Sequence, residues 1–88
     1  MKVLRSASAG TMESSDAYVE IEPAAELSID IESVVGRQFG DKIEAAVREV
    51  LADCGVDLAA VRVTDRGALD CVIRARVETA VKRSGGEN

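Results

Sequence analysis

Hydrophobic and polar residues alternate in two segments of the first third of the chain. In residues 17–22 the apolar members are Ala17, Val19 and Ile21. In residues 27–32 they are Leu27, Ile29 and Ile31. A period of two is typical of a strand with one buried face, so both segments are predicted as strands. Pro23 ends the first of them.

Two further strands are predicted with weaker patterns. Residues 3–12 are small and mixed, and they precede the turn-forming sequence Glu-Ser-Ser-Asp at residues 13–16. Val61 and Val63 alternate with polar neighbours in a short segment that ends at Asp65. The sequence therefore predicts a turn between the first two strands and a fourth strand late in the chain.

The spacing of apolar residues becomes helical after Ser33, a candidate N-cap. The apolar positions of this helix are Val35, Phe39, Ile43, Ala46, Val47, Val50 and Cys54. Gly36 and Gly40 each cost a helix roughly 1 kcal/mol relative to alanine, so its firm part is expected from Asp41. Gly55 suits the left-handed residue that closes such a helix.

A second helix is predicted after Asp65, the candidate cap of its first turn. Its apolar stripe consists of Leu69, Val72, Ile73, Val77, Ala80 and Val81. Residues 84–88 are expected to form a flexible tail, which leaves 1–83 as a single domain. The order βββαβα predicts an α+β two-layer sandwich, a mostly antiparallel sheet of about four strands with two helices on one face.

The second face of this sheet is expected to be acidic and open to water or to a partner protein. Its residues are Tyr18, Glu20, Glu22, Ser28, Asp30 and Glu32. The formal net charge of -5 disfavours nucleic acid as a partner, because it repels phosphate. No stretch approaches the roughly 20 apolar residues that cross a bilayer, so a cytoplasmic protein without a membrane partner is expected.

Candidate chemistry is scarce in this sequence. There is no histidine, the side chain that ordinarily titrates near neutral pH. Cys54 and Cys71 lack metal-ligand spacing and are predicted to be small, reduced core residues, with a reactive thiol at Cys71 as the alternative. Ser14 is predicted to lie exposed at the tip of its turn, where a modifying enzyme can reach its hydroxyl. The alternative is an ordinary polar turn.

Three blocks of the sequence carry a family resemblance. Residues 9–16 read AGTMESSD, residues 65–78 read DRGALDCVIRARVE, and residues 33–40 between them include Gln-Phe-Gly. In this order the blocks closely resemble the citrate lyase acyl carrier protein, the gamma chain of that enzyme. The resemblance spans nearly the whole chain.

The resemblance implies that Ser14 carries 2'-(5''-phosphoribosyl)-3'-dephospho-coenzyme A through a phosphodiester bond. Ser15 stands where family members often have glycine, and it offers a competing hydroxyl. The thiol of this arm would hold acetyl and citryl thioesters, with the alpha subunit exchanging acetate for citrate and the beta subunit releasing oxaloacetate. The chain itself would be a non-catalytic carrier, with these two subunits and a prosthetic-group transferase as its partners.

Two other functions remain open at this point. The acyl carrier subunit of malonate decarboxylase shares the prosthetic group, although the block from Asp65 favours citrate lyase. The third hypothesis is a non-covalent adaptor that binds a protein through the acidic sheet face. Conventional four-helix carriers are disfavoured, because they need an Asp-Ser-Leu motif that this sequence lacks.

The last helix is basic within an acidic protein. Its cations, with the one that precedes it, are Arg66, Arg74, Arg76, Lys82 and Arg83. Favourable placement near a helix C-terminus and a local pair between Asp70 and Arg74 explain most of them. The alternative is that Arg74 or Arg76 docks a partner subunit or a phosphate of the arm.

Overall fold

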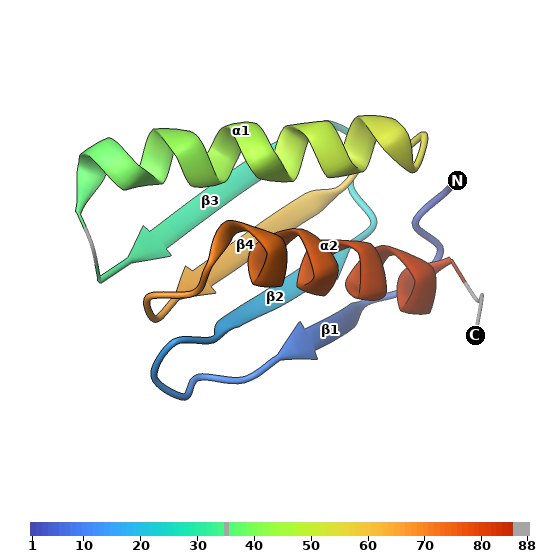
Figure 1. Cartoon of the computed structure of the whole chain (residues 1–88). Coiled ribbons are helices and arrows are strands. Elements are labelled where there is room, and N and C mark those ends of the chain that lie inside the picture. The colour runs from blue at the N-terminus through green and yellow to red at the C-terminus, as the bar shows by residue number, and fades with distance from the viewer. Residues whose placement is uncertain (35, 86–88) are drawn as a thin grey trace.

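One face of a four-stranded sheet carries both helices (Figure 1). The computed structural model describes residues 1–34 and 36–85. Its elements are β1 (Ala7–Gly10), β2 (Ala17–Glu22), β3 (Ser28–Ser33), α1 (Arg37–Asp53), β4 (Ala60–Asp65) and α2 (Asp70–Ser84). The predicted order βββαβα and the two-layer α+β architecture are confirmed.

The strands lie in the order β1-β2-β4-β3. β1 pairs with β2 and β2 with β4 in antiparallel fashion, whereas β3 and β4 are parallel and are connected through α1. The sheet is therefore mostly antiparallel, as predicted. Asp65 lies opposite both Ala17 and Ser33. The carboxyl ends of β3 and β4 therefore lie at the same end of the sheet as the start of β2.

The core is aliphatic and lies between the sheet and the helices. On β2 and β4, Val19, Ile21, Val61 and Val63 are at most 2% exposed. The helices contribute Ile43, Val47, Leu51, Ile73, Val77, Ala80 and Val81. Each fully buried aliphatic side chain of valine or leucine size contributes about 1.5–3 kcal/mol to folding. The period of two in residues 17–22 thus identified the buried face correctly.

The first strand is shorter than predicted. Only Ala7–Gly10 pairs with β2, whereas the sequence indicated residues 3–12. The amides of Leu4 and Arg5 donate to the Ser84 carbonyl, at 2.9 and 3.1 Å, so this part of the chain follows the end of α2 instead of the sheet. The Arg83 guanidinium also donates to the Ser8 carbonyl of β1, at 2.8 Å.

The start of α1 also differs from the prediction. Ser33 is the last residue of β3 rather than an N-cap, because the N-cap position of α1 is occupied by Gly36. The Ser33 hydroxyl donates to the Asp65 carboxylate at 2.8 Å. The helix begins at Arg37, after Gly36 with a φ of 92°, and not near Asp41. Val35 lies outside the described residues.

One apolar position predicted for α1 is not buried, whereas the residue predicted to close the helix is confirmed. Phe39 is 43% exposed and is not a core residue, and its ring lies 5.7 Å from the Lys42 Nζ. The predicted left-handed residue after the helix is confirmed, because Gly55 has a φ of 70°.

The apolar stripe of α2 is confirmed at its centre and wrong at its start. Ile73, Val77, Ala80 and Val81 are buried, and Val72 is half-buried. Leu69 is 71% exposed, because it precedes the helix. Ser84, which the sequence assigned to the tail, is the fully buried last residue of α2, and residues 86–88 lie outside the described part. Neither helix of the described chain is long and apolar enough to span a membrane.

Gly10 permits the close approach of β1 to β2 at the end of the strand. Its φ is 95°, and a Cβ at this position would lie 1.9 Å from the Ala17 carbonyl oxygen. We expect Gly10→Ala to lower the free energy of unfolding by about 3 kcal/mol or more, from steric overlap and backbone strain together. Urea unfolding followed by circular dichroism measures this loss.

The control for this substitution is Gly67→Ala. Gly67 has a φ of 93° but no heavy atom within 4 Å of an added Cβ. This variant should lose only the backbone contribution, about 1–2 kcal/mol. Equal losses in the two variants would show that close approach at Gly10 is unimportant.

Candidate functional site

The predicted turn between the first two strands is present and has the two serines at its centre. We call residues 13–16 the serine turn. The Asp16 amide donates to the Glu13 carbonyl at 3.1 Å, which closes a four-residue turn. Ser15 has a φ of 66°, a value that favours glycine. The turn therefore retains a strained conformation without the glycine that would make it easy.

Main-chain hydrogen bonds tie the serine turn to the connection between β4 and α2. The Ser15 amide donates to the Arg66 carbonyl at 2.8 Å, and the Arg66 amide donates to the Asp16 carbonyl at 2.9 Å. These bonds continue the pairing of β2 and β4 beyond its last register pair, Ala17 with Asp65. The turn is thus an extension of the sheet rather than a free loop.

The Asp16 carboxylate is the centre of the side-chain contacts. The Thr11 hydroxyl and the Ala17 amide each donate to it at 2.7 Å. From α2, the Arg76 Nε and a terminal guanidinium nitrogen donate to its two oxygens at 3.0 and 3.1 Å. Hydrogen bonds from Thr11 and Arg76 lower the pKa of Asp16 from its ordinary 3.8 to about 2.

Asp65 organises the neighbouring loop in the same way. Its carboxylate accepts hydrogen bonds from the Gly67 and Ala68 amides, at 3.1 and 2.8 Å, and from Ser33. The prediction that Asp65 caps the last helix is wrong, because α2 starts at Asp70 with no side-chain cap. The buried carboxylate instead fixes the loop that presents Arg66 to the serine turn.

Ser14 lies at the exposed tip of this arrangement. Within the part of the chain that the structure describes, no group forms a hydrogen bond with its hydroxyl. An exposed hydroxyl of this kind suits a covalent attachment at one point, which needs no binding cavity in the chain. Ser15 is exposed as well, but its amide is engaged by Arg66.

The arginines of α2 are engaged within the chain. Arg74 pairs with Asp70 at 2.6 Å, as predicted, and with Glu49 of α1 at 3.1 Å. Arg76 binds Asp16, a contact that the sequence analysis missed. The two residues are 60 positions apart, and nothing in the pattern of charges selected one acid from the many in the chain.

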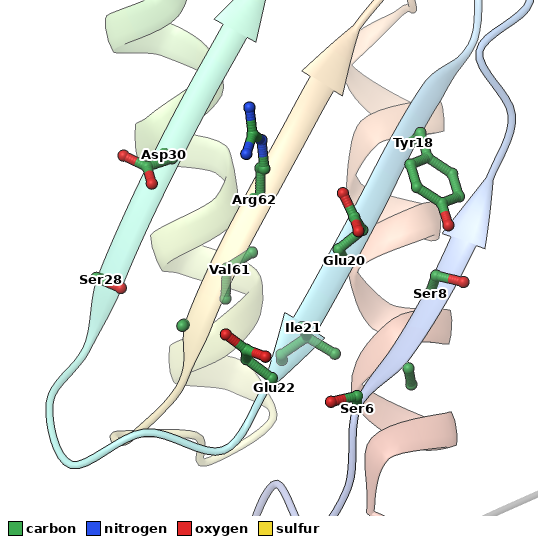
Figure 2. Close-up of a pocket in the computed structure, with 12 residues that line it drawn as sticks. Ser6, Ser8, Tyr18, Glu20, Ile21, Glu22, Ser28, Asp30, Val61 and Arg62 are labelled. Carbon is green, nitrogen blue, oxygen red and sulfur yellow. The ribbon is translucent and has the colours of Figure 1, made fainter.

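The open face of the sheet holds a shallow depression of about 590 Å³. Figure 2 shows Arg62 of β4 between Glu20 of β2 and Asp30 of β3, and the strand register places it opposite both. The predicted acidic surface therefore has a cation at its centre. Only Tyr18 and the acidic and serine positions were predicted on this face, and Arg62 was not among them.

The cysteines are less buried than predicted. Both are free, but Cys71 is exposed and Cys54 is only half-buried against the core. Burial raises the pKa of the Cys54 thiol, which makes it less nucleophilic. Among the described residues no cluster of acidic, cysteine or histidine side chains is suited to hold a metal ion. The serine turn is thus the best candidate for the functional site.

The contacts of Asp16 predict a pH dependence of stability. Because its pKa is lower in the folded chain, the carboxylate stabilises the fold above about pH 4, and this contribution is lost as the pH falls toward 2. We expect wild type to be more stable than Asp16→Asn near pH 6. The difference should shrink between pH 4 and pH 2 in urea unfolding curves. A constant difference over that interval would contradict the assigned contacts.

Comparisons with known proteins show which family the chain resembles. Residues 4–84 match the family model for acyl carrier proteins described as malonate decarboxylase delta subunit (MdcD). A solved structure, a Pseudomonas malonate decarboxylase hetero-tetramer in complex with malonate, contains a similar chain. It has a TM-score of 0.79 and 26% identity, over 94% of this chain and 87% of that one.

Curated relatives are more similar in sequence. The citrate lyase acyl carrier protein of Haemophilus influenzae (strain PittEE) is 54% identical over 99% of this chain and 92% of its own length. Citrate lyase acyl carrier protein 2 of Salmonella typhi is 49% identical over 96% and 89%. These matches confirm the resemblance drawn from residues 9–16 and 65–78. The chain belongs to the family of citrate lyase acyl carrier proteins.

Proposed function

We propose that Ser14 is the attachment point of a 2'-(5''-phosphoribosyl)-3'-dephospho-coenzyme A arm, on which this carrier presents acyl groups within citrate lyase. The observation that supports this most strongly is the exposed, unengaged hydroxyl of Ser14 on a turn whose other residues are held in place. As an acyl carrier protein, the chain is a carrier rather than a catalyst.

In the attachment reaction Ser14 acts as the nucleophile. Its Oγ forms a new bond to the phosphorus of an activated ribosyl phosphate in a nucleotide donor. The phosphoanhydride bond of the donor breaks, the displaced phosphate group leaves, and the hydroxyl proton passes to a base of the prosthetic-group transferase. Serine needs no activating neighbour of its own, because the modifying enzyme supplies base and metal.

Once attached, the arm supplies a terminal thiol that carries the acyl group as a thioester. The residues of this chain hold the root of the arm. Asp16 connects the serine turn to α2, and Arg66 connects it to the end of β4. Ser14 therefore projects from a turn that is anchored at one end of the sheet. Tethering through the arm raises the local concentration of the acyl group at the partner active sites.

The proposed partners are the alpha subunit, which transfers the acyl group, and the beta subunit, which cleaves the citryl group, in addition to the transferase. The solved relative is one chain of a hetero-tetramer, which agrees with a role inside a larger assembly. We propose that the carrier acts in the cytoplasm. Its two free cysteines suit a reducing compartment.

Two alternatives compete with this proposal. The carrier of malonate decarboxylase is the nearer one, because a chain of that complex has the same fold. The relatives with 49% and 54% identity favour citrate lyase over it. A non-covalent adaptor is the other, supported by the depression around Arg62 on the open sheet face. An adaptor would show no adduct by intact mass when isolated with its partners.

We predict that Ser14→Ala abolishes attachment and leaves the fold intact. An exposed turn serine contributes little to stability, so the free energy of unfolding should change by less than about 0.5 kcal/mol. The measurement is intact mass after co-expression with the transferase, followed by peptide mapping of residues 11–17. Wild type should gain the mass of the arm, and Ser14→Ala should gain none.

Ser15→Ala is the matched control, because it removes the neighbouring hydroxyl from the same turn. It should be modified like wild type. An adduct that persists in Ser14→Ala and disappears in Ser15→Ala would move the attachment site by one residue. Unmodified wild type that still assembles with both lyase subunits would favour the adaptor.

A further inference from the structure

The side chains of Asp16 and Arg76 connect the attachment turn to a helix distant in sequence. Asp16 is 15% exposed and Arg76 40% exposed, so their contact is partly shielded from water. Both carboxylate oxygens receive a hydrogen bond from the guanidinium, a geometry with more directional restraint than a single contact. Rotation of the turn about its strands would break this pairing.

Arg76 also passes close to the opposite side of the turn. Its Cδ lies 3.2 Å from the place that a Cβ on Gly10 would occupy, so the side chain runs closely over the end of β1. Thr11 follows Gly10 and donates to the same carboxylate. The Asp16 carboxylate therefore joins Arg76 of α2 to Thr11, on the other side of the turn.

The ion pair of Asp16 and Arg76 supports a turn conformation that is unfavourable at one of its residues. Ser15 keeps a φ of 66°, which is unfavourable for a residue with a side chain. Two main-chain hydrogen bonds with Arg66 accompany this conformation. The ion pair of Asp16 and Arg76 holds the turn in the position in which these bonds form. Without the pair, we expect the turn to populate several conformations.

A rigid turn has little value for a swinging arm, because the arm itself supplies the reach. It has value in the step in which Ser14 is itself the substrate. There the hydroxyl must lie in line with a phosphorus atom in another active site, and prior ordering lowers the entropic cost of that alignment. The rigidity of this turn therefore points to the attachment reaction.

We propose that Asp16 and Arg76 are positioning residues for arm attachment, and that they hold the serine turn in the conformation that the transferase recognises. This inference rests on the proposed function of Ser14. If only a fraction of the molecules has the competent turn, the apparent affinity of the transferase for the carrier falls by that fraction. Loss of the pair should thus raise KM and leave kcat nearly unchanged.

The test measures attachment rates on the full chain with the transferase and its nucleotide donor, by intact mass at several carrier concentrations. We expect Arg76→Gln to raise the KM for the carrier about tenfold and to change kcat less than about twofold. Arg76→Lys retains the charge but not the paired donors, so its KM should lie between those of wild type and Arg76→Gln. Thr11→Val, a second variant on the turn side, should raise KM in the same direction.

Arg74→Gln is the matched control. It removes an arginine from the same helix, and this arginine also binds two carboxylates, but they lie on α1 and α2 and not in the turn. Its KM should stay within about twofold of wild type. All rates are measured where urea unfolding shows each variant to be more than about 99% folded, so that the fraction of unfolded acceptor has no influence.

Hydrogen exchange of the Ser15 and Asp16 amides provides an independent measurement of turn order. Both amides are hydrogen-bonded in the turn, and their exchange should accelerate in Arg76→Gln but not in Arg74→Gln. Faster exchange with an unchanged KM would overturn the proposal, because a loosened turn would still be recognised. A raised KM without faster exchange would overturn it as well, since Arg76 would then contact the transferase directly.

The failure of the proposed function has a different signature. In that case wild type gains no adduct, or gains it on Ser15, and the positioning role is overturned with it. Modification of Ser14 at equal KM in wild type and Arg76→Gln leaves the proposed function intact and overturns only the positioning role.

Discussion

Burial of only one face of the sheet is the constraint on which the rest of the structure depends. Val19 and Ile21 of β2 lie opposite Val63 and Val61 of β4, and all four are covered by the helices. A shift of this register by one residue would turn these side chains to water. The same register sets where β2 begins, and it brings Asp16 and Ser15 beside Arg66.

The sequence was informative wherever the signal was periodic and local. The alternation in residues 17–22 and the helical spacing around Val77 located the core correctly, because burial on one side enforces both patterns. Polar side chains were less predictable. Ser33 and Asp65 both had the chemistry of helix caps, yet they bind each other across β3 and β4. Their partners were fixed by tertiary structure.

The candidate site shows the same division. The position of Ser14 in a turn could be predicted from its neighbours in the sequence. The family of the chain could be predicted from two separated blocks of sequence. The network that holds the turn could not. Arg76 competes with several other cations for many acids, and only the packing of α2 against β1 and β2 brings it to Asp16. The proposed attachment site thus combines a short local sequence with a support drawn from the whole fold.

The brevity of β1 has a consequence for a subunit of a multi-subunit complex. An exposed strand at the margin of a sheet offers unpaired main-chain groups to any passing chain, and long margins favour aggregation. At the β1 edge this margin is four residues long, the chain before it turns away toward Ser84, and the Arg83 guanidinium donates to the Ser8 carbonyl. The β1 edge of the domain therefore presents little template for unwanted strand addition.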